Sequence, residues 1–120
     1  ARIAALMQRG RLRRVDALPT ETLLRMVTVE GARALGLQGE VGELRPGMQA
    51  DLCAVSIEAP HTQPVHDPLA TLFHAARGSD VILTVVAGRV LFAGESVLTL
   101  NEQEVRQAIE QCAERMRAHQ

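Results

Sequence analysis

The segment of residues 41–57 constrains this chain most, because it joins a specific turn to an aliphatic run. Pro46 presets φ to about −65°, and Gly47 accepts the positive φ that a type II turn requires at its third position. The Leu, Cys, Val and Ile side chains of residues 52–57 suit a covered sheet. The segment therefore predicts a short strand, a reversal at residues 45–48 and a buried strand.

Apolar residues at helical spacing predict helices on both sides of this segment. One helix covers residues 1–8 and stops at Gly10, and a second begins with Thr20 as its N-cap and ends at Gly36. A last helix follows Asn101, which has capping-box spacing to an acidic residue. We expect this last helix to be amphipathic and to lie on the domain surface. Its inner face comprises Val105, Ala108, Ile109, Cys112 and Met116.

Two further elements are predicted between residues 58 and 100. Asp67 and Pro68 suit the N-cap and the first position of a short helix. Residues 80–94 have the β-branched density of two strands, and the Ala87-Gly88 pair supplies the turn of a hairpin.

These elements define an α+β chain of 120 residues, which is one domain or part of one. We divide it into helices at residues 1–36, a small antiparallel or mixed sheet with one inserted helix at residues 37–100, and an amphipathic helix at residues 101–120. The sheet should have roughly four strands.

The charge balance argues against nucleic acid and membrane partners. The chain has 13 basic and 14 acidic residues and a net charge of −1, which gives no general attraction to phosphate or anionic lipid. No run approaches the roughly 18 apolar residues of a membrane span, and no signal peptide is visible. We therefore expect a cytoplasmic protein.

A basic cluster is the one feature that favours nucleic acid binding. Arg9, Arg11, Arg13 and Arg14 fall within six positions. Only two residues of the chain are aromatic, however, so the cluster lacks the stacking side chains that accompany single-strand binding. We interpret it as a solvated loop or helix end and keep nucleic acid binding as the weaker alternative.

Three histidines and an aspartate form the only group that could be arranged into a metal site: His61, His66, Asp67 and His74. Their spacing is irregular, since two lie in a proline-rich loop and one lies beyond the start of a helix. Metal sites usually have tighter ligand spacing in the sequence. We therefore interpret the three histidines and His119 as loop and surface residues.

Other nucleophiles and acids also favour structural roles. Cys53 and Cys112 are most simply small buried hydrophobic residues, although a disulfide stays open. Asp51 directly precedes a strand, where its carboxylate can accept amide protons from a turn. Ser56, Ser79 and Ser96 lack the Gly-x-Ser-x-Gly elbow of a serine hydrolase. We therefore predict no catalytic, cofactor-binding or metal-binding residue in this chain.

A longer sequence pattern resembles that of a known enzyme family. The form Gly-x-Leu-x-x-Gly-x-x-Ala-Asp-Leu, which follows Gly-Ala-x-Ala-Leu-Gly-Leu at residues 31–37, resembles the C-terminal part of metal-dependent amidohydrolases. The runs at residues 64–68 and 87–89 are most similar to 5'-methylthioadenosine/S-adenosylhomocysteine deaminases and their chlorohydrolase relatives. The resemblance extends from about Thr20 to Met116, and Met48 stands where the family usually has Lys. The pattern residues are Gly42, Leu44, Gly47, Ala50, Asp51 and Leu52.

The resemblance implies that this chain is the structural end of an enzyme. The helices of residues 1–36 would follow the last strand of a (β/α)8 barrel, and residues 42–97 would form the C-terminal share of a small β-sandwich. A complete barrel needs about 250 residues. The parent would hydrolytically deaminate or dechlorinate an aminated purine nucleoside or similar heterocycle, using water activated by zinc or another divalent metal. The family's ligand motifs, such as His-x-His, do not occur here, so we expect the isolated chain to be inactive.

A second hypothesis treats the chain as a free-standing, non-catalytic module. The resemblance implies that partner strands from the N-terminus of the parent complete the sandwich. Without them, the strands at residues 52–57 and 81–86 would have uncovered edges or faces, and such sheets tend to pair with another copy. We therefore expect a homo-oligomer, with a small-molecule substrate only in the parent enzyme.

Overall fold

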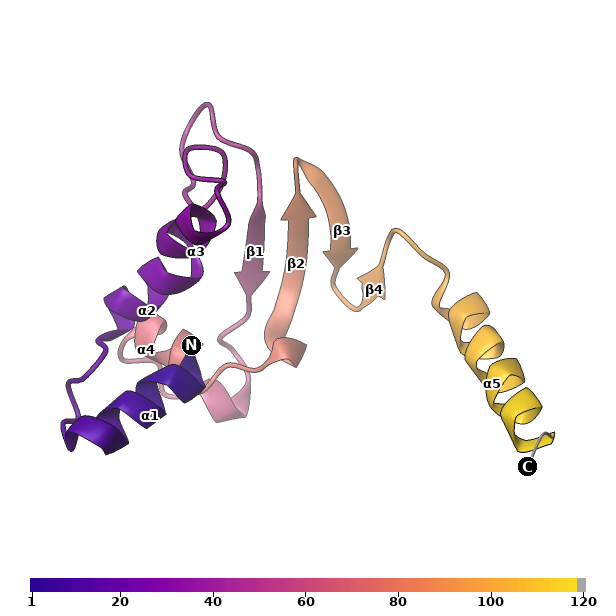
Figure 1. Ribbon diagram of the computed structural model, residues 1–120, viewed down its shortest axis with the longest axis horizontal. Helices are drawn as coiled ribbons and strands as arrows, with labels where there is room; N and C mark the ends of the chain where they lie inside the picture. Colours follow the sequence, from indigo (N-terminus) through magenta and orange to yellow (C-terminus); the bar gives the residue numbers. More distant parts are fainter. Residues whose placement is uncertain (119–120) are drawn as a thin grey trace.

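The computed structural model describes residues 1–118 and contains a group of short helices, a four-stranded sheet and a separate final helix (Figure 1). The helical group lies beyond one edge of the sheet, and the final helix lies beyond the opposite edge (Figure 1). None of the helices in residues 1–118 combines the length and the apolar character that crossing a bilayer requires. The helices are α1 (Arg2–Leu12), α2 (Thr20–Val27), α3 (Val29–Ala34), η1 (Pro60–Thr62), α4 (Pro68–His74), η2 (Gly78–Asp80) and α5 (Glu102–Ala118).

The sheet is antiparallel at every pairing, and its spatial order follows the sequence. The predicted hairpin is confirmed: its turn residues Ala87 and Gly88 have φ values of 48° and 77°, as a two-residue type I′ turn requires. The α+β prediction therefore agrees with a mixed structure built around one antiparallel sheet. The strands are β1 (Leu52–Val55), β2 (Val81–Val86), β3 (Arg89–Ala93) and β4 (Ser96–Val97).

The turn at residues 45–48 is also confirmed, although its flanking strands differ from the prediction. Gly47 has a φ of 91°, and the amide of Met48 donates to the carbonyl of Arg45 at 3.3 Å. The expected strand before the turn is reduced to an isolated bridge between Gln38 and Val41. The strand after it ends at residue 55 and is only half-buried.

The helix expected from Thr20 to Gly36 is in fact two helices, because the chain breaks at Thr28. This residue has φ −117° and ψ −96°, and its hydroxyl donates to the carbonyl of Leu24 at 2.7 Å. Such local hydrogen bonds compete with helix continuation. Thr20 is the first helical residue rather than the N-cap. Gly36 has the expected positive φ of 75°.

The helical group holds the apolar core. Ala5 of α1, Leu23 of α2 and Phe73 of α4 are buried against one another, with three leucines packed around them. Helix α4 begins as predicted, since the Asp67 carboxylate accepts the amide of Leu69 at 2.9 Å. Helix α1 continues through Gly10 to Leu12, against the prediction that it stops there. The leucines that surround this core are Leu18, Leu69 and Leu72.

The sheet and α5 are open by comparison. The chain has a radius of gyration of 18.9 Å, whereas a compact chain of this length has about 14 Å. It exposes 9269 Å², whereas a compact monomer of 13.0 kDa exposes about 6,300 Å². About 3,000 Å² of additional surface therefore lacks the cover that a compact domain supplies.

This openness corrects two predictions, on the cysteines and on α5, and shows which of the expected edges or faces is uncovered at residues 81–86. Cys53 and Cys112 are exposed rather than buried, because Cys53 lies on an uncovered sheet face and Cys112 lies on α5. The segment of residues 81–86 is not an edge, since β2 pairs with both β1 and β3; its uncovered part is the face with Ile82 and Val86, which are 48% and 44% exposed. Helix α5 projects away from the domain rather than lying on its surface (Figure 1).

Candidate functional site

The four residues of the candidate metal group line one shallow hollow, with a volume of about 310 Å³. The loop of residues 61–67 forms one wall, and α4 forms the other. Tertiary structure thus brings together side chains whose spacing in the sequence is irregular. The remaining histidine, His119, lies outside the described residues.

His61 is held by an aspartate that the sequence analysis did not single out. Its Nε2 lies 2.8 Å from the Oδ2 of Asp80, and Asp80 is only 8% exposed. The same carboxylate accepts the amide of Arg77 at 2.7 Å, and the carbonyl of Asp80 accepts the amide of Ser56 at 2.8 Å. Asp80 therefore ties η1, η2 and the chain after β1 together.

The electrostatics of Asp80 follow from these donors. The hydrogen bond from His61 is the larger cause that lowers the pKa of Asp80 below the ordinary aspartate value, and the Arg77 amide adds to it. Both favour the ionised carboxylate. A signal for this role was present in the sequence, since Asp80 stands three residues after Arg77, the spacing of an N-cap and its N3 partner.

The other candidates are also engaged structurally or open to water. Asp67 caps α4. His74 has its Nε2 3.5 Å from a terminal guanidinium nitrogen of Arg9. His66 is exposed.

The donor set does not fit a resident zinc ion. Among residues 1–118, no three or more His, Cys, Asp and Glu side chains are close enough together to hold a metal. Structural and catalytic zinc sites use at least three protein ligands. We therefore assign no catalytic step to a metal bound by these residues.

Asp51 has the structural role that the sequence predicted. Its Oδ1 accepts the amide of Ala87 at 2.6 Å, and the carbonyl of the preceding Ala50 accepts the amide of Gly88 at 3.1 Å. The carboxylate thus holds the hairpin turn against the start of β1. Two sequence patterns that lie more than 30 residues apart meet at this junction.

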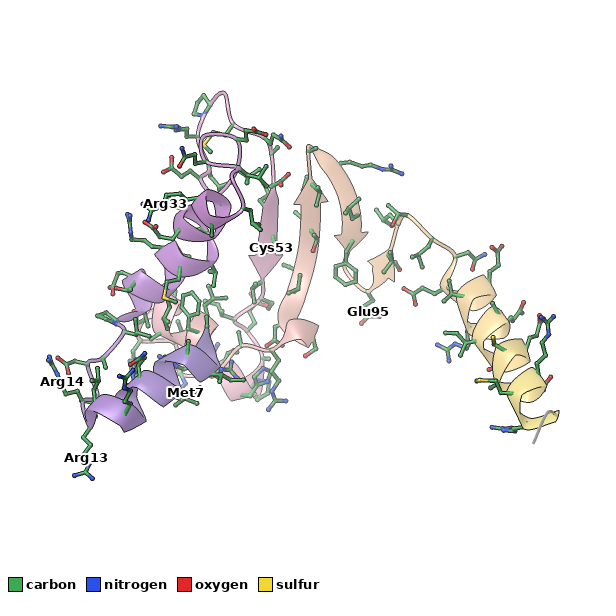
Figure 2. All side chains as sticks on the ribbon, viewed as in Figure 1. Met7, Arg13, Arg14, Arg33, Cys53 and Glu95 are labelled. Carbon is green, nitrogen blue, oxygen red and sulfur yellow. The ribbon has the colours of Figure 1, made fainter. Side chains whose placement is uncertain are left out.

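Two arginines of the cluster make contacts within the chain. Arg9 donates to the carbonyl of Ala17 at 3.2 Å. Arg14, which Figure 2 shows near the C-terminal end of α1, forms an exposed ion pair with Asp16. The pair lowers the pKa of Asp16, chiefly through the hydrogen bond from Arg14. Two of the four arginines therefore serve local contacts.

A second hollow lies between α3 and the loop before β1 and contains three arginines. Arg25 and Arg33 each pair with Glu30 at 3.2 Å, and Arg45 pairs with Glu43 at 3.5 Å. These ion pairs compensate most of the positive charge, so the hollow has no strong attraction for an anion.

Comparison with known proteins gives consistent matches. A model of the Amidohydrolase family matches residues 1–91. The chain is 46% identical over 93 residues to a 5-methylthioadenosine/S-adenosylhomocysteine deaminase from Syntrophobacter fumaroxidans, covering 78% of this chain and 21% of the relative. It is 41% identical over 113 residues to a 5'-deoxyadenosine deaminase from Methanosarcina barkeri, covering 94% of this chain and 26% of the relative.

Solved structures match the fold as well. An adenosine deaminase from Xanthomonas campestris with bound zinc superposes with a TM-score of 0.88 and 32% identity, over 98% of this chain and 27% of that one. A zinc complex of atrazine chlorohydrolase from Arthrobacter aurescens gives a TM-score of 0.80 and 28% identity, over 89% of this chain and 24% of that one. The chain spans about a fifth to a quarter of the length of the curated relatives it matches.

Proposed function

Because this chain belongs to the amidohydrolase family, we propose that it is the C-terminal part of a longer aminohydrolase, in which it supplies structure rather than catalytic groups. Its predicted resemblance to the 5'-methylthioadenosine/S-adenosylhomocysteine deaminases and chlorohydrolases is confirmed. In the proposed parent, the helical group follows a (β/α)8 barrel, and the four strands are one share of a β-sandwich.

The junction at Asp51 carries the structural half of this proposal. The family pattern at residues 42–52 ends in Ala50, Asp51 and Leu52. The carboxylate of Asp51 accepts a hydrogen bond from the amide of Ala87. A carboxylate that accepts a turn amide in this way stabilises the turn, which is a structural role. The pattern by which the chain resembles the family is therefore explained by the fold of the sheet.

The names of the relatives support an adenosine-type substrate for the parent. The relatives include deaminases for methylthioadenosine, S-adenosylhomocysteine and 5'-deoxyadenosine, which share an adenine base and differ at the 5' position of the ribose. We propose that the parent releases ammonia from such a nucleoside. Dechlorination is the weaker candidate, because the chlorohydrolase structures are 28% identical to this chain.

Zinc in two solved neighbours supports a divalent metal in the parent. Because residues 1–118 do not offer a ligand set, we propose that its ligands come from other parts of the longer protein. The cytoplasmic location and the division at residues 1–36, 37–100 and 101–120 stay predictions.

The experiment compares the ammonia release of two proteins: the product of the whole reading frame that encodes this chain, and the 120-residue chain alone. Both proteins are incubated with methylthioadenosine, S-adenosylhomocysteine and adenosine, and ammonia release is measured with and without a chelator. We expect the whole protein to release ammonia in a chelator-sensitive way and the 120-residue chain to release none, even with added zinc. Ammonia release by the purified 120-residue chain would overturn the structural role, and failure of the whole protein on all three nucleosides would overturn the substrate class.

The alternative, a free-standing module that pairs through a sheet edge, has weaker support. The two edges are β1, whose pairing is irregular between Ala54 and Val55, and β4, which has two residues. Short and irregular edge strands are poor templates for pairing with another chain. The predicted homo-oligomer therefore needs a different surface.

A further inference from the structure

Helix α1 is oriented in the opposite way to an ordinary surface helix. Its inner face, at Arg2, Ala5 and Arg9, lies toward the rest of the helical group. A surface helix normally buries its apolar side chains and exposes its charged ones, whereas the other face of α1 is apolar and exposed. At about 3.6 residues per turn, positions 3 and 7 lie nearly opposite positions 5 and 9. The residues of this exposed face, which we call the α1 outer face, are Ile3, Leu6, Met7 and Gly10.

The inner face is fixed mainly by polar contacts. The Nε of Arg2 donates to the carbonyl of Phe73 at 2.8 Å, and its Nη2 donates to the carbonyl of Ala76. Both carbonyls lie at the C-terminal end of α4, where the helix dipole favours a cation. Ala5 is fully buried in the apolar core. These contacts set the rotation of α1 about its axis, so the α1 outer face points away from the core.

The α1 outer face has no cover within the described part of the chain. Ile3, Leu6 and Met7 are 72%, 58% and 69% exposed. Figure 1 shows α1 at the end of the helical group that is opposite α3. The cover of this face must therefore come from outside residues 1–118.

Gly10 gives an independent observation on the same face. It lies inside α1, it is exposed, and its φ is not positive. An added methyl group would meet no atom within 4 Å, so the described residues do not require glycine here. Glycine is among the least favourable residues inside a helix, but it lets another backbone approach closely. Its place next to Met7 on the wheel of the helix indicates a cover that packs tightly.

The size of the α1 outer face indicates that the cover belongs to the same molecule. The helix has 11 residues, so it is about 16 Å long and 10 Å wide, and one face covers on the order of 200 Å². A stable contact between separate proteins buries roughly 800 Å² on each partner. A contact within one chain avoids the cost of association, so a face of this size can be effective there.

The comparisons leave ample chain for such a cover. The curated relatives are matched over only 21% and 26% of their lengths. The zinc-bound adenosine deaminase matches 98% of this chain with a TM-score of 0.88, in 27% of its own length. The open arrangement of these elements therefore also occurs within a much longer enzyme.

We propose that the α1 outer face is an interface inside the parent enzyme, covered by an apolar surface from the part that lies outside these 120 residues and closest to the helix backbone at Gly10. This inference rests on the proposed function, since it requires the longer protein. It makes α1 a joint between two parts: Arg2 and Ala5 fix it to the helical group, and Ile3 and Met7 fix the group to the remainder of the enzyme.

The first test compares the midpoint temperatures of thermal unfolding of variants of the product of the whole reading frame. Met7→Glu places an unpaired charge in the covered face and should lower the midpoint by about 5 °C or more, or prevent folding. Gln8→Glu adds the same charge outside the α1 outer face and should shift the midpoint by less than about 2 °C. Equal midpoints in the two variants would overturn the proposal.

A second variant, Gly10→Ala, gives opposite signs for an open and a covered face. On a helix face in water, alanine is the better helix former and raises the midpoint. On a tightly covered face, the added methyl group displaces the cover and should lower the midpoint by about 2 °C or more. An unchanged or raised midpoint would contradict the interface. The change is small, so this test stands even where Met7→Glu does not fold.

Sedimentation velocity of wild type and Gly10→Ala separates an internal interface from a contact between two copies. We expect the same mass for both proteins. A Gly10→Ala protein that loses subunits would place a second copy on this face and overturn the internal interface. Neither measurement uses the deaminase reaction. An inactive protein that shows the expected shifts would therefore overturn the proposed substrate class and leave the interface in place.

Discussion

Leu23 in α2 and Ile109 in α5 are both aliphatic residues on the apolar face of a helix, yet their surroundings are opposite. Leu23 is fully buried among Ala5 and Phe73, whereas Ile109 is 64% exposed. Amphipathic spacing thus identifies the face of a helix that is to be covered, but it does not identify the covering surface. The packed end of this chain finds its cover within the chain, and the open end does not.

The largest expected difference in the free energy of unfolding comes from truncating these two aliphatic side chains to alanine. Leu23→Ala removes fully buried methyl groups and leaves a cavity, so it should lower the free energy of unfolding by about 2–4 kcal/mol. Ile109→Ala removes exposed groups and should change monomer stability by less than about 0.5 kcal/mol. Urea unfolding measures both. Similar losses in the two variants would show that α5 is packed within the monomer.

A smaller effect is expected where the sheet is held together by a side chain rather than by a core. Asp51→Ala removes the acceptor of the Ala87 amide and should cost about 1 kcal/mol. Asp51→Asn keeps a carbonyl oxygen at the same place and should recover most of this loss. Thermal unfolding followed by circular dichroism compares the variants. If Asp51→Asn is as unstable as Asp51→Ala, then the negative charge, not the hydrogen bond, stabilises the turn.

The smallest effect at neutral pH concerns the contact between His61 and Asp80. The pKa of Asp80 is lowered in the folded chain, so its contribution is fully present above the ordinary aspartate pKa of about 3.9. That contribution is lost as the pH falls through the lowered pKa of Asp80. In this range the Asp80 carboxylate is protonated more readily in the unfolded chain than in the folded chain, which favours unfolding. We expect the midpoint temperature of thermal unfolding to decrease as the pH is lowered from about 4 to about 2.

The matched variant for this prediction is Asp80→Asn, which cannot titrate. It should flatten the acid part of the stability curve, because the folded chain then lacks the carboxyl whose pKa the fold lowers. An acid slope that is the same in wild type and Asp80→Asn would assign the pH dependence to other carboxylates.

Local chemistry was predictable where a few neighbouring residues decide the conformation. The turn at Pro46 and Gly47, the Asp67 cap and the Ala87-Gly88 hairpin all depend on φ values and donors within four residues. The break at Thr28 was missed because apolar periodicity alone does not report a hydroxyl that donates to a carbonyl four residues back. In the candidate hollow, the pairing of His61 with Asp80 joins positions 19 residues apart, and no periodic pattern encodes it.

The sequence by itself determined the family, the turns, the hairpin and the amphipathic character of α5, because these depend on short-range sterics and on the order of a few motifs. Only the tertiary structure decided which apolar faces are covered. It placed Phe73 against Leu23 and left Cys53 and Ile109 of α5 exposed. The physical reason is that burial depends on what surface lies opposite a side chain, and that surface comes from residues distant in the sequence or from another molecule.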